Sequence, residues 1–173
     1  MGCGNDPTPP PDVQTPGPRL GGVEIRVPSA GLEFVAPAGW RVEQDQASPL
    51  VAKVTTGRAS ISVFRYPRTE PLPGSRAELD TAAEALASAA RQRDPTFAEL
   101  KRSRLSVDGR PAIVLRATQT VDGQPRTVRS THVYAFDAEV VIDAIAPAAD
   151  FKRVDAEAFR PLVRSLELAA PAG

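Results

Sequence analysis

Two Asp-Gly pairs, Asp108-Gly109 and Asp122-Gly123, constrain the fold of this chain more than any other feature. A two-residue Asp-Gly loop favours a type I′ turn, whose twist matches that of the antiparallel strands it joins. Asp137-Ala138 is a further tight break in the same region. The chain around these breaks therefore predicts a four-strand antiparallel meander, formed by residues 97–107, 110–121, 124–136 and 139–146.

The first half of the chain predicts shorter strands. Apolar and polar residues alternate with the period of a half-buried strand. Short stretches that contain Pro and Gly, and the stretch Thr56-Gly57-Arg58, separate these runs. The expected strands are residues 23–27, 32–36, 40–43, 52–55 and 59–66. With the meander, they predict an α+β fold built on an antiparallel sheet of about six to eight strands.

Two main helices are expected to flank this sheet. Ser75 and Glu78 have the capping-box spacing, and Pro95 ends the first helix near Asp94, so this helix covers about residues 75–93. The second helix is expected at about residues 155–166, with Asp155 as its N-cap. Pro161 lies inside that stretch and should kink the helix or move its start.

The N-terminal segment indicates where the protein works. Cys3 lies between Gly2 and Gly4 and precedes a Pro-rich stretch, as at the start of a mature bacterial lipoprotein whose cysteine is acylated. No apolar signal run precedes Cys3, so we expect acylation in a parent protein that carries the signal. An unmodified cysteine in a disordered tail is the alternative. N-myristoylation is disfavoured because Asp6 stands where Ser or Thr is required.

The expected organisation has three parts. Residues 1–22 form a disordered Pro-rich tether, residues 23–168 form one domain, and residues 169–173 form a flexible tail. The tether and Cys3 would hold the domain at the extracytoplasmic face of the bacterial cell membrane.

Composition excludes several classes of site. A single cysteine allows no internal disulfide and no cysteine-based metal site. A formal net charge of +0 gives no attraction to nucleic acid. Neither a phosphate-binding glycine loop nor a Gly-x-Ser-x-Gly elbow occurs. We therefore expect no metal, no cofactor, no nucleic-acid partner and no catalytic site.

Two stretches carry a family resemblance. In the first, an apolar strand at residues 32–36 leads into the turn Pro37-Ala38-Gly39-Trp40. In the second, a strand at residues 140–147 and a short break precede a helix that ends in Ser165-Leu166. This pattern resembles the PsbP-like family, typified by the P subunit of the photosystem II oxygen-evolving complex and by a Ran-binding nuclear import factor. The resemblance spans about residues 23–168. It implies an antiparallel sheet flanked by helices and a protein-binding role, and it does not imply an enzyme.

A few polar residues are candidates for a binding surface. His132, the sole histidine, shares one predicted strand face with Ser130 and Tyr134, and Arg129 lies beside it in sequence. His132, Tyr134 and Arg129 are the candidate residues of a binding surface, but for His132 we expect a plain half-exposed strand histidine. Asp143 interrupts an apolar strand and needs a partner, for which Arg129 or Arg116 is expected.

Three functions follow from these observations. The main hypothesis is a non-enzymatic, lipid-anchored extracytoplasmic domain that binds an envelope protein or scaffolds a complex. The alternative is a carrier of a small apolar ligand or lipid, in a cavity between sheet and helix lined by side chains such as Phe34, Phe64 and Leu86. The third is a hydrolase that uses Ser130, His132 and a carboxylate, which requires hydrogen-bond contact among the three groups.

Overall fold

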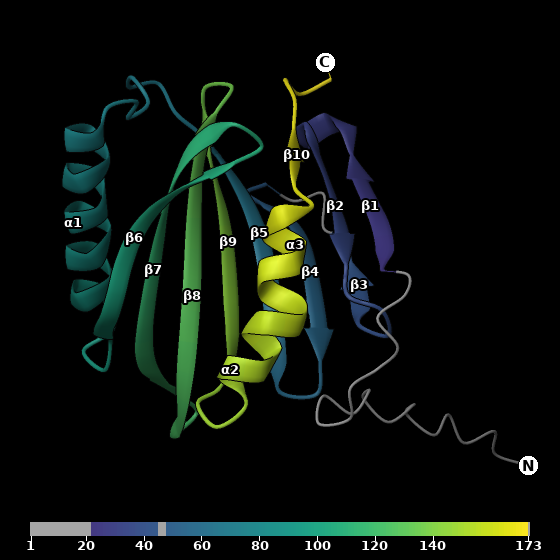
Figure 1. Cartoon of the computed structure of the whole chain (residues 1–173), viewed down its shortest axis with the longest axis vertical. Coiled ribbons are helices and arrows are strands. Elements are labelled where there is room, and N and C mark those ends of the chain that lie inside the picture. Colours follow the sequence, from purple (N-terminus) through teal and green to yellow (C-terminus); the bar gives the residue numbers. More distant parts are fainter. Residues whose placement is uncertain (1–21, 45–47, 173) are drawn as a thin grey trace, which may run out of the picture.

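The computed structural model describes residues 22–44 and 48–172. Cys3 and residues 1–21 of the predicted tether lie outside this part. The described chain is α+β and mostly strand, as predicted (Figure 1). None of its helices is long and apolar enough to cross a membrane.

A seven-stranded antiparallel sheet forms the centre of the fold. Its strand order is β3-β4-β5-β9-β8-β7-β6. The strands are β3 (Arg41–Glu43), β4 (Leu50–Thr56), β5 (Ala59–Pro67), β6 (Ala98–Val107), β7 (Arg110–Val121), β8 (Gln124–Ala135) and β9 (Ala138–Pro147). The predicted meander is confirmed as β6 to β9, each paired with the next.

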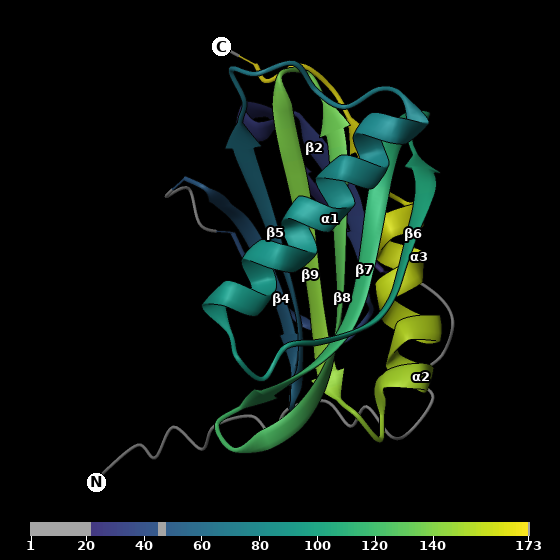
Figure 2. The same cartoon turned by 90° about the vertical axis from the view of Figure 1, so that its left-hand side faces the viewer.

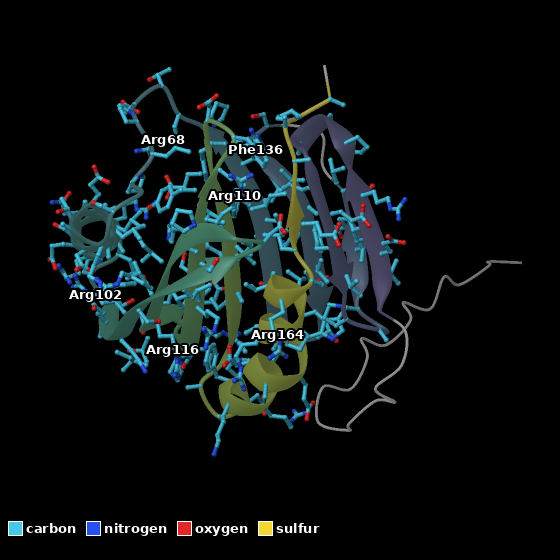
Figure 3. The ribbon with its side chains drawn as sticks, turned by 45° about the horizontal axis from the view of Figure 1, so that its top comes forward. Arg68, Arg102, Arg110, Arg116, Phe136 and Arg164 are labelled. Carbon is cyan, nitrogen blue, oxygen red and sulfur yellow. The ribbon has the colours of Figure 1, made fainter. Side chains whose placement is uncertain are left out.

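The turns of the meander have the geometry that Asp-Gly favours. Asp108 and Gly109 have φ of 49° and 70°, and Asp122 and Gly123 have φ of 50° and 72°. The β8–β9 turn uses the same left-handed geometry at Phe136 and Asp137 (φ 50° and 51°), without a glycine. Phe136 therefore does not continue the strand face that carries His132. Its ring packs against the opposite core and lies 4.5 Å from the Arg110 guanidinium (Figure 3).

A second, three-stranded sheet has the order β1-β2-β10. It contains β1 (Val23–Val27), β2 (Leu32–Ala36) and β10 (Glu167–Leu168), with a 3₁₀ turn at Pro28–Ala30 between the first two strands. Beyond β10, the Ala169 and Ala172 N–H groups donate to the carbonyls of Gly31 and Pro28. The end of the described chain thus runs along its beginning.

Helix α1 (Arg76–Arg93) forms where the capping box predicts it. The Glu78 N–H donates to the Ser75 hydroxyl at 3.2 Å, and the Ser75 N–H donates to the Glu78 carboxylate at 2.8 Å. Asp94 ends the helix in an extended conformation before Pro95, as expected.

The C-terminal helical segment begins earlier than predicted. It consists of α2 (Phe151–Val154), a π-helical turn (Asp155–Phe159) and α3 (Arg160–Arg164). Asp155 is therefore not the N-cap; it lies inside the helix and pairs with Arg129. The π turn widens the backbone immediately before Pro161, which cannot donate an intrahelical hydrogen bond. This local widening accommodates the proline without ending the helix.

The helices cover opposite faces of the large sheet (Figure 2). The main core lies between the sheet, β2 and the C-terminal helical segment, where Phe34, Phe159 and Leu162 are fully buried. Trp40 packs edge-on against Phe159 with ring centroids 6.4 Å apart. A smaller core lies under α1 and includes Leu79, Ala83, Ala87, Ile113, Leu115 and Tyr134. Because this second core is small, part of the sheet face beside α1 remains open.

Candidate functional site

A groove of about 780 Å³ lies between α1 and the sheet face formed by β5, β9, β8 and β7. We call it the α1 groove. The second half of α1 and the chain after it contribute Leu86, Ala90, Arg93 and Phe97 to its lining, and β5 contributes Phe64 and Tyr66. The predicted cavity between sheet and helix thus has a counterpart that contains Phe64 and Leu86. Phe34 does not line it, because that side chain is buried in the core on the other face.

Strand register arranges the groove floor in rows. One row crosses the sheet as Ser62, Asp143, Ser130 and Leu115. The next row is Phe64, Val141, His132 and Ile113, and the row after it contains Tyr66, Glu139 and Tyr134. Polar groups therefore occupy the centre of a largely apolar floor.

Five polar side chains on this face form one connected network: Arg68, Glu139, His132, Ser130 and Asp143. Arg68 lies in the chain that follows β5 (Figure 3). Its Nη1 donates to Glu139 Oε2 at 2.9 Å. Glu139 Oε1 lies 2.7 Å from His132 Nδ1, and His132 Nε2 lies 2.8 Å from Ser130 Oγ. Ser130 Oγ donates to Asp143 Oδ1 at 2.5 Å. We refer to this set as the polar network.

The histidine of this network is buried. His132 is only 8% exposed, so the expectation of a half-exposed strand histidine is wrong. Its position in a central strand, under the side chains of the neighbouring rows, removes it from solvent. Both ring nitrogens instead have partners in the network, which satisfies a polar group that would otherwise be costly to bury.

Contacts within the network keep Glu139 in its charged form. Burial favours the neutral form of Glu139, but the hydrogen bond and charge of His132 and the charge of Arg68 outweigh it and hold the Glu139 pKa below its ordinary value. Glu139 is therefore a carboxylate that accepts from Nδ1–H of His132. The Ser130 hydroxyl donates to Asp143 and also lies within hydrogen-bond distance of His132 Nε2.

The distances meet the contact requirement of the hydrolase hypothesis, but two further features argue against it. A nucleophilic serine must give its proton to the histidine, whereas here the Ser130 hydroxyl donates to Asp143. An oxyanion hole also needs free N–H donors near the nucleophile. Strand β8 is paired with β7 on one side and β9 on the other around Ser130, so its backbone donors serve the sheet.

The other predicted surface residues do not join His132 in one exposed patch. Tyr134 lies on the same face, but it is 5% exposed and packs under α1. Burial and the nearby Glu139 charge raise the Tyr134 pKa above its ordinary value. Arg129 lies on the opposite face and donates to Asp155 at 2.5 and 3.0 Å. Alternation along β8 separates Arg129 from His132, since three residues apart in a strand means opposite faces.

The expected partners of Asp143 are also wrong. Arg129 pairs with Asp155, and the Arg116 guanidinium lies 5.2 Å from the Phe151 ring centroid. Both arginines face the C-terminal helical segment, whereas Asp143 faces the α1 groove. Ser130 is its hydrogen-bond donor instead. Among residues 22–44 and 48–172, His, Cys, Asp and Glu form no group of three suited to a metal ion.

Aromatic side chains form one wall of the groove. Phe64 and Tyr66 stack with ring centroids 5.9 Å apart and an interplanar angle of 22°. Tyr66 remains 39% exposed although it is a large side chain. Burial and the charge of Asp143 raise the Tyr66 pKa, and the charge of Arg93 opposes this rise. A partly open aromatic wall beside a carboxylate is chemically suited to ligand binding.

Comparison with known proteins identifies the fold. No protein-family model matches the sequence, and a search of curated proteins finds no match. Solved structures do match. Cyanobacterial PsbP (CyanoP) from Synechocystis sp. PCC 6803 has a TM-score of 0.66 and 11% sequence identity, with 98% of each chain covered.

Two further structures match over most of their length. LpqN of Mycobacterium tuberculosis, described as involved in cell envelope biogenesis, has a TM-score of 0.60 and 13% identity, covering 80% of this chain and 83% of that one. The Saccharomyces cerevisiae Ran-binding protein Mog1p has a TM-score of 0.58 and 12% identity, covering 87% and 97%. The predicted PsbP-like fold is confirmed. Identities this low establish the fold alone.

Proposed function

We propose that this protein is a non-enzymatic, envelope-associated binding domain that holds a small ligand in the α1 groove. The observation that carries the proposal is the groove itself. Its volume of about 780 Å³ is within the range of ligand pockets in proteins, and polar groups at its centre interrupt a mostly apolar lining. The carrier alternative from the sequence thus has more structural support than scaffolding.

Location in the envelope rests on the N-terminal sequence. Cys3 between two glycines, followed by prolines, fits a lipid-anchored domain on the extracytoplasmic side of the membrane. The similar fold of LpqN, a protein described as involved in cell envelope biogenesis, is consistent with such a location. Mass spectrometry of the native parent protein should find acylated Cys3. An unmodified Cys3 or a cytoplasmic location would refute the anchor.

Ligand binding is tested by filling the groove. Ser62 is half-buried on the groove floor, so Ser62→Trp should occupy the space above Asp143. Ser103→Trp is the matched control, since Ser103 is exposed on β6 and does not line the groove. Native mass spectrometry of protein purified from envelopes should show a bound small molecule in the native chain and in Ser103→Trp. Equal occupancy in Ser62→Trp would place the ligand elsewhere and refute the proposal.

A protein partner is the second candidate, and the edge strand β6 favours it. Leu100 is 56% exposed and Leu105 is 37% exposed on this strand, whose outer edge has no neighbour in the described sheet. Exposed sheet edges are common sites of strand addition by a partner. Under this hypothesis, Leu100→Lys should abolish capture of one specific envelope protein, and Leu86→Lys in the groove should not. The reverse pattern would favour the groove.

A further inference from the structure

Asp143 is the one carboxylate of the polar network without a direct cationic partner. Glu139 contacts both His132 and Arg68, whereas the only hydrogen bond to Asp143 within the described chain comes from the neutral hydroxyl of Ser130. Asp143 is half-buried and lines the α1 groove. A carboxylate offers about four lone-pair sites, so the hydrogen bond from Ser130 uses only part of the accepting capacity of Asp143. A half-buried carboxylate in this state favours a cation from outside the chain.

The side chains around Asp143 suit an organic cation. Ser62 on β5 lies directly opposite Asp143, as Ser130 does on β8, so a serine flanks Asp143 on each side. Phe64 and Tyr66 occupy the next rows on the same strand and face. Aromatic faces attract a cation that a carboxylate already holds, and they also contact its apolar part. The same surroundings are poor for a divalent metal ion, which requires several oxygen or nitrogen ligands.

Two arginines also line the groove, and neither neutralises Asp143. Arg68 is held by Glu139 and lies at the opposite end of the polar network. Arg93 is exposed at the end of α1, where water and salt screen its charge. The groove floor around Asp143 therefore remains locally negative, and the two arginines contribute mainly at its rim.

We propose that the α1 groove binds a small organic cation, with its ammonium group against Asp143 and its apolar body against Phe64, Val141 and Leu86. This inference rests on the proposed function, because it assigns the ligand class of the same groove. The site suits a single positive charge on an apolar chain, since Asp143 is the carboxylate of the polar network without a cationic partner and Phe64, Val141 and Leu86 line the groove beside it.

The test compares three probes of equal length and different charge. Hexylammonium, hexanol and hexanoate are titrated separately into the isotope-labelled protein at neutral pH, and backbone amide shifts of β5, β8 and β9 are followed by NMR. Hexylammonium should bind about tenfold or more tightly than hexanol, because it adds a charge-assisted hydrogen bond to the same apolar contact. Hexanoate should bind more weakly than hexanol. Equal affinity for hexylammonium and hexanol would overturn the inference.

Two variants assign the effect to Asp143. Asp143→Asn should reduce the affinity for hexylammonium about tenfold and leave hexanol binding unchanged. Asp122→Asn is the matched control, because Asp122 lies in an exposed turn where Asn-Gly is equally favourable. If Asp143→Asn unfolds, Ser62→Lys provides the second variant: its ammonium group lies across from Asp143 and should displace hexylammonium while the fold is retained.

The outcomes separate the two proposals. Binding of all three probes in the groove with no preference for charge, or undiminished hexylammonium affinity in Asp143→Asn, refutes the cation and leaves the ligand-binding function in place. Failure of all three probes to shift any groove amide, together with no ligand in protein from envelopes, refutes the binding function itself.

Discussion

Removing the charge of Glu139 should strongly destabilise the fold. Glu139 is 6% exposed and accepts hydrogen bonds from His132 at 2.7 Å and Arg68 at 2.9 Å. Glu139→Gln keeps the shape and one acceptor oxygen, but it leaves the buried His132 ring and the Arg68 guanidinium without their carboxylate. Removing one partner of a buried hydrogen bond to a charged group costs about 3 kcal/mol. For a domain of this length, that loss lowers the melting temperature by roughly 6–12 °C.

The same variant should change the pH dependence of stability. Because contacts with His132 and Arg68 hold the Glu139 pKa below its ordinary value of 4.5, the folded chain binds fewer protons here than the unfolded chain does. This contribution is fully present above pH 4.5 and is lost as the pH falls through the folded-state pKa. Glu139→Gln removes the titrating group, so its stability should fall less steeply below that pH than the stability of the native chain.

Urea denaturation over a series of pH values measures both effects. Glu70→Gln is the matched control, because Glu70 also contacts Arg68 (3.8 Å) but its side chain is 73% exposed. An exposed pair of this kind contributes at most about 1 kcal/mol, so the control should remain close to the native chain. Equal stability of Glu139→Gln and Glu70→Gln at neutral pH, or a Glu139→Gln variant that keeps the full acid slope of the native chain, would contradict this role of Glu139.

Three other substitutions test the local structure by chemical denaturation. Ser75→Ala removes the N-cap hydroxyl of α1 and should cost about 1 kcal/mol, whereas Ser88→Ala within the same helix should cost nothing; equal effects would argue against the capping box. Asp155→Asn leaves the mostly buried Arg129 without its carboxylate and should cost about 3 kcal/mol, and a change under about 0.5 kcal/mol would contradict this. Asp137→Gly relieves the strain of a left-handed backbone (φ 51°) and should stabilise the folded chain by about 0.5 kcal/mol. A lower unfolding midpoint would show that the Asp137 side chain contributes more to stability than the backbone strain costs.

The meander and α1 could be predicted because their signals lie within a few consecutive residues. An Asp-Gly pair sets the turn geometry by itself, and the capping box joins Ser75 to Glu78 across one helical turn. The turn at Phe136 and Asp137 has a weaker signal, because it contains no glycine and a bulky residue such as Phe136 rarely adopts a positive φ. Its position depends on pairing between β8 and β9.

The start of the C-terminal helix was missed for a similar reason. Asp155 has the residue type of an N-cap, but the structure uses it inside the helix as the partner of Arg129 from β8. The π-helical turn before Pro161 depends on how this segment packs against the sheet.

One correction to the candidate site could have been made from the sequence. Arg129 and His132 are three residues apart in a predicted strand, and this odd spacing already places them on opposite faces.

The sequence by itself determined the fold class, the four-strand meander, the first helix and the PsbP-like resemblance. Each of these depends on turn geometry, capping or periodicity, which are properties of neighbouring residues. Only the tertiary structure decided that His132 is buried between Glu139 and Ser130, and that Asp143 faces a groove. Those contacts join β8 and β9 through their register and leave the sheet open beside α1, so they depend on which strands pair and how far one helix covers them.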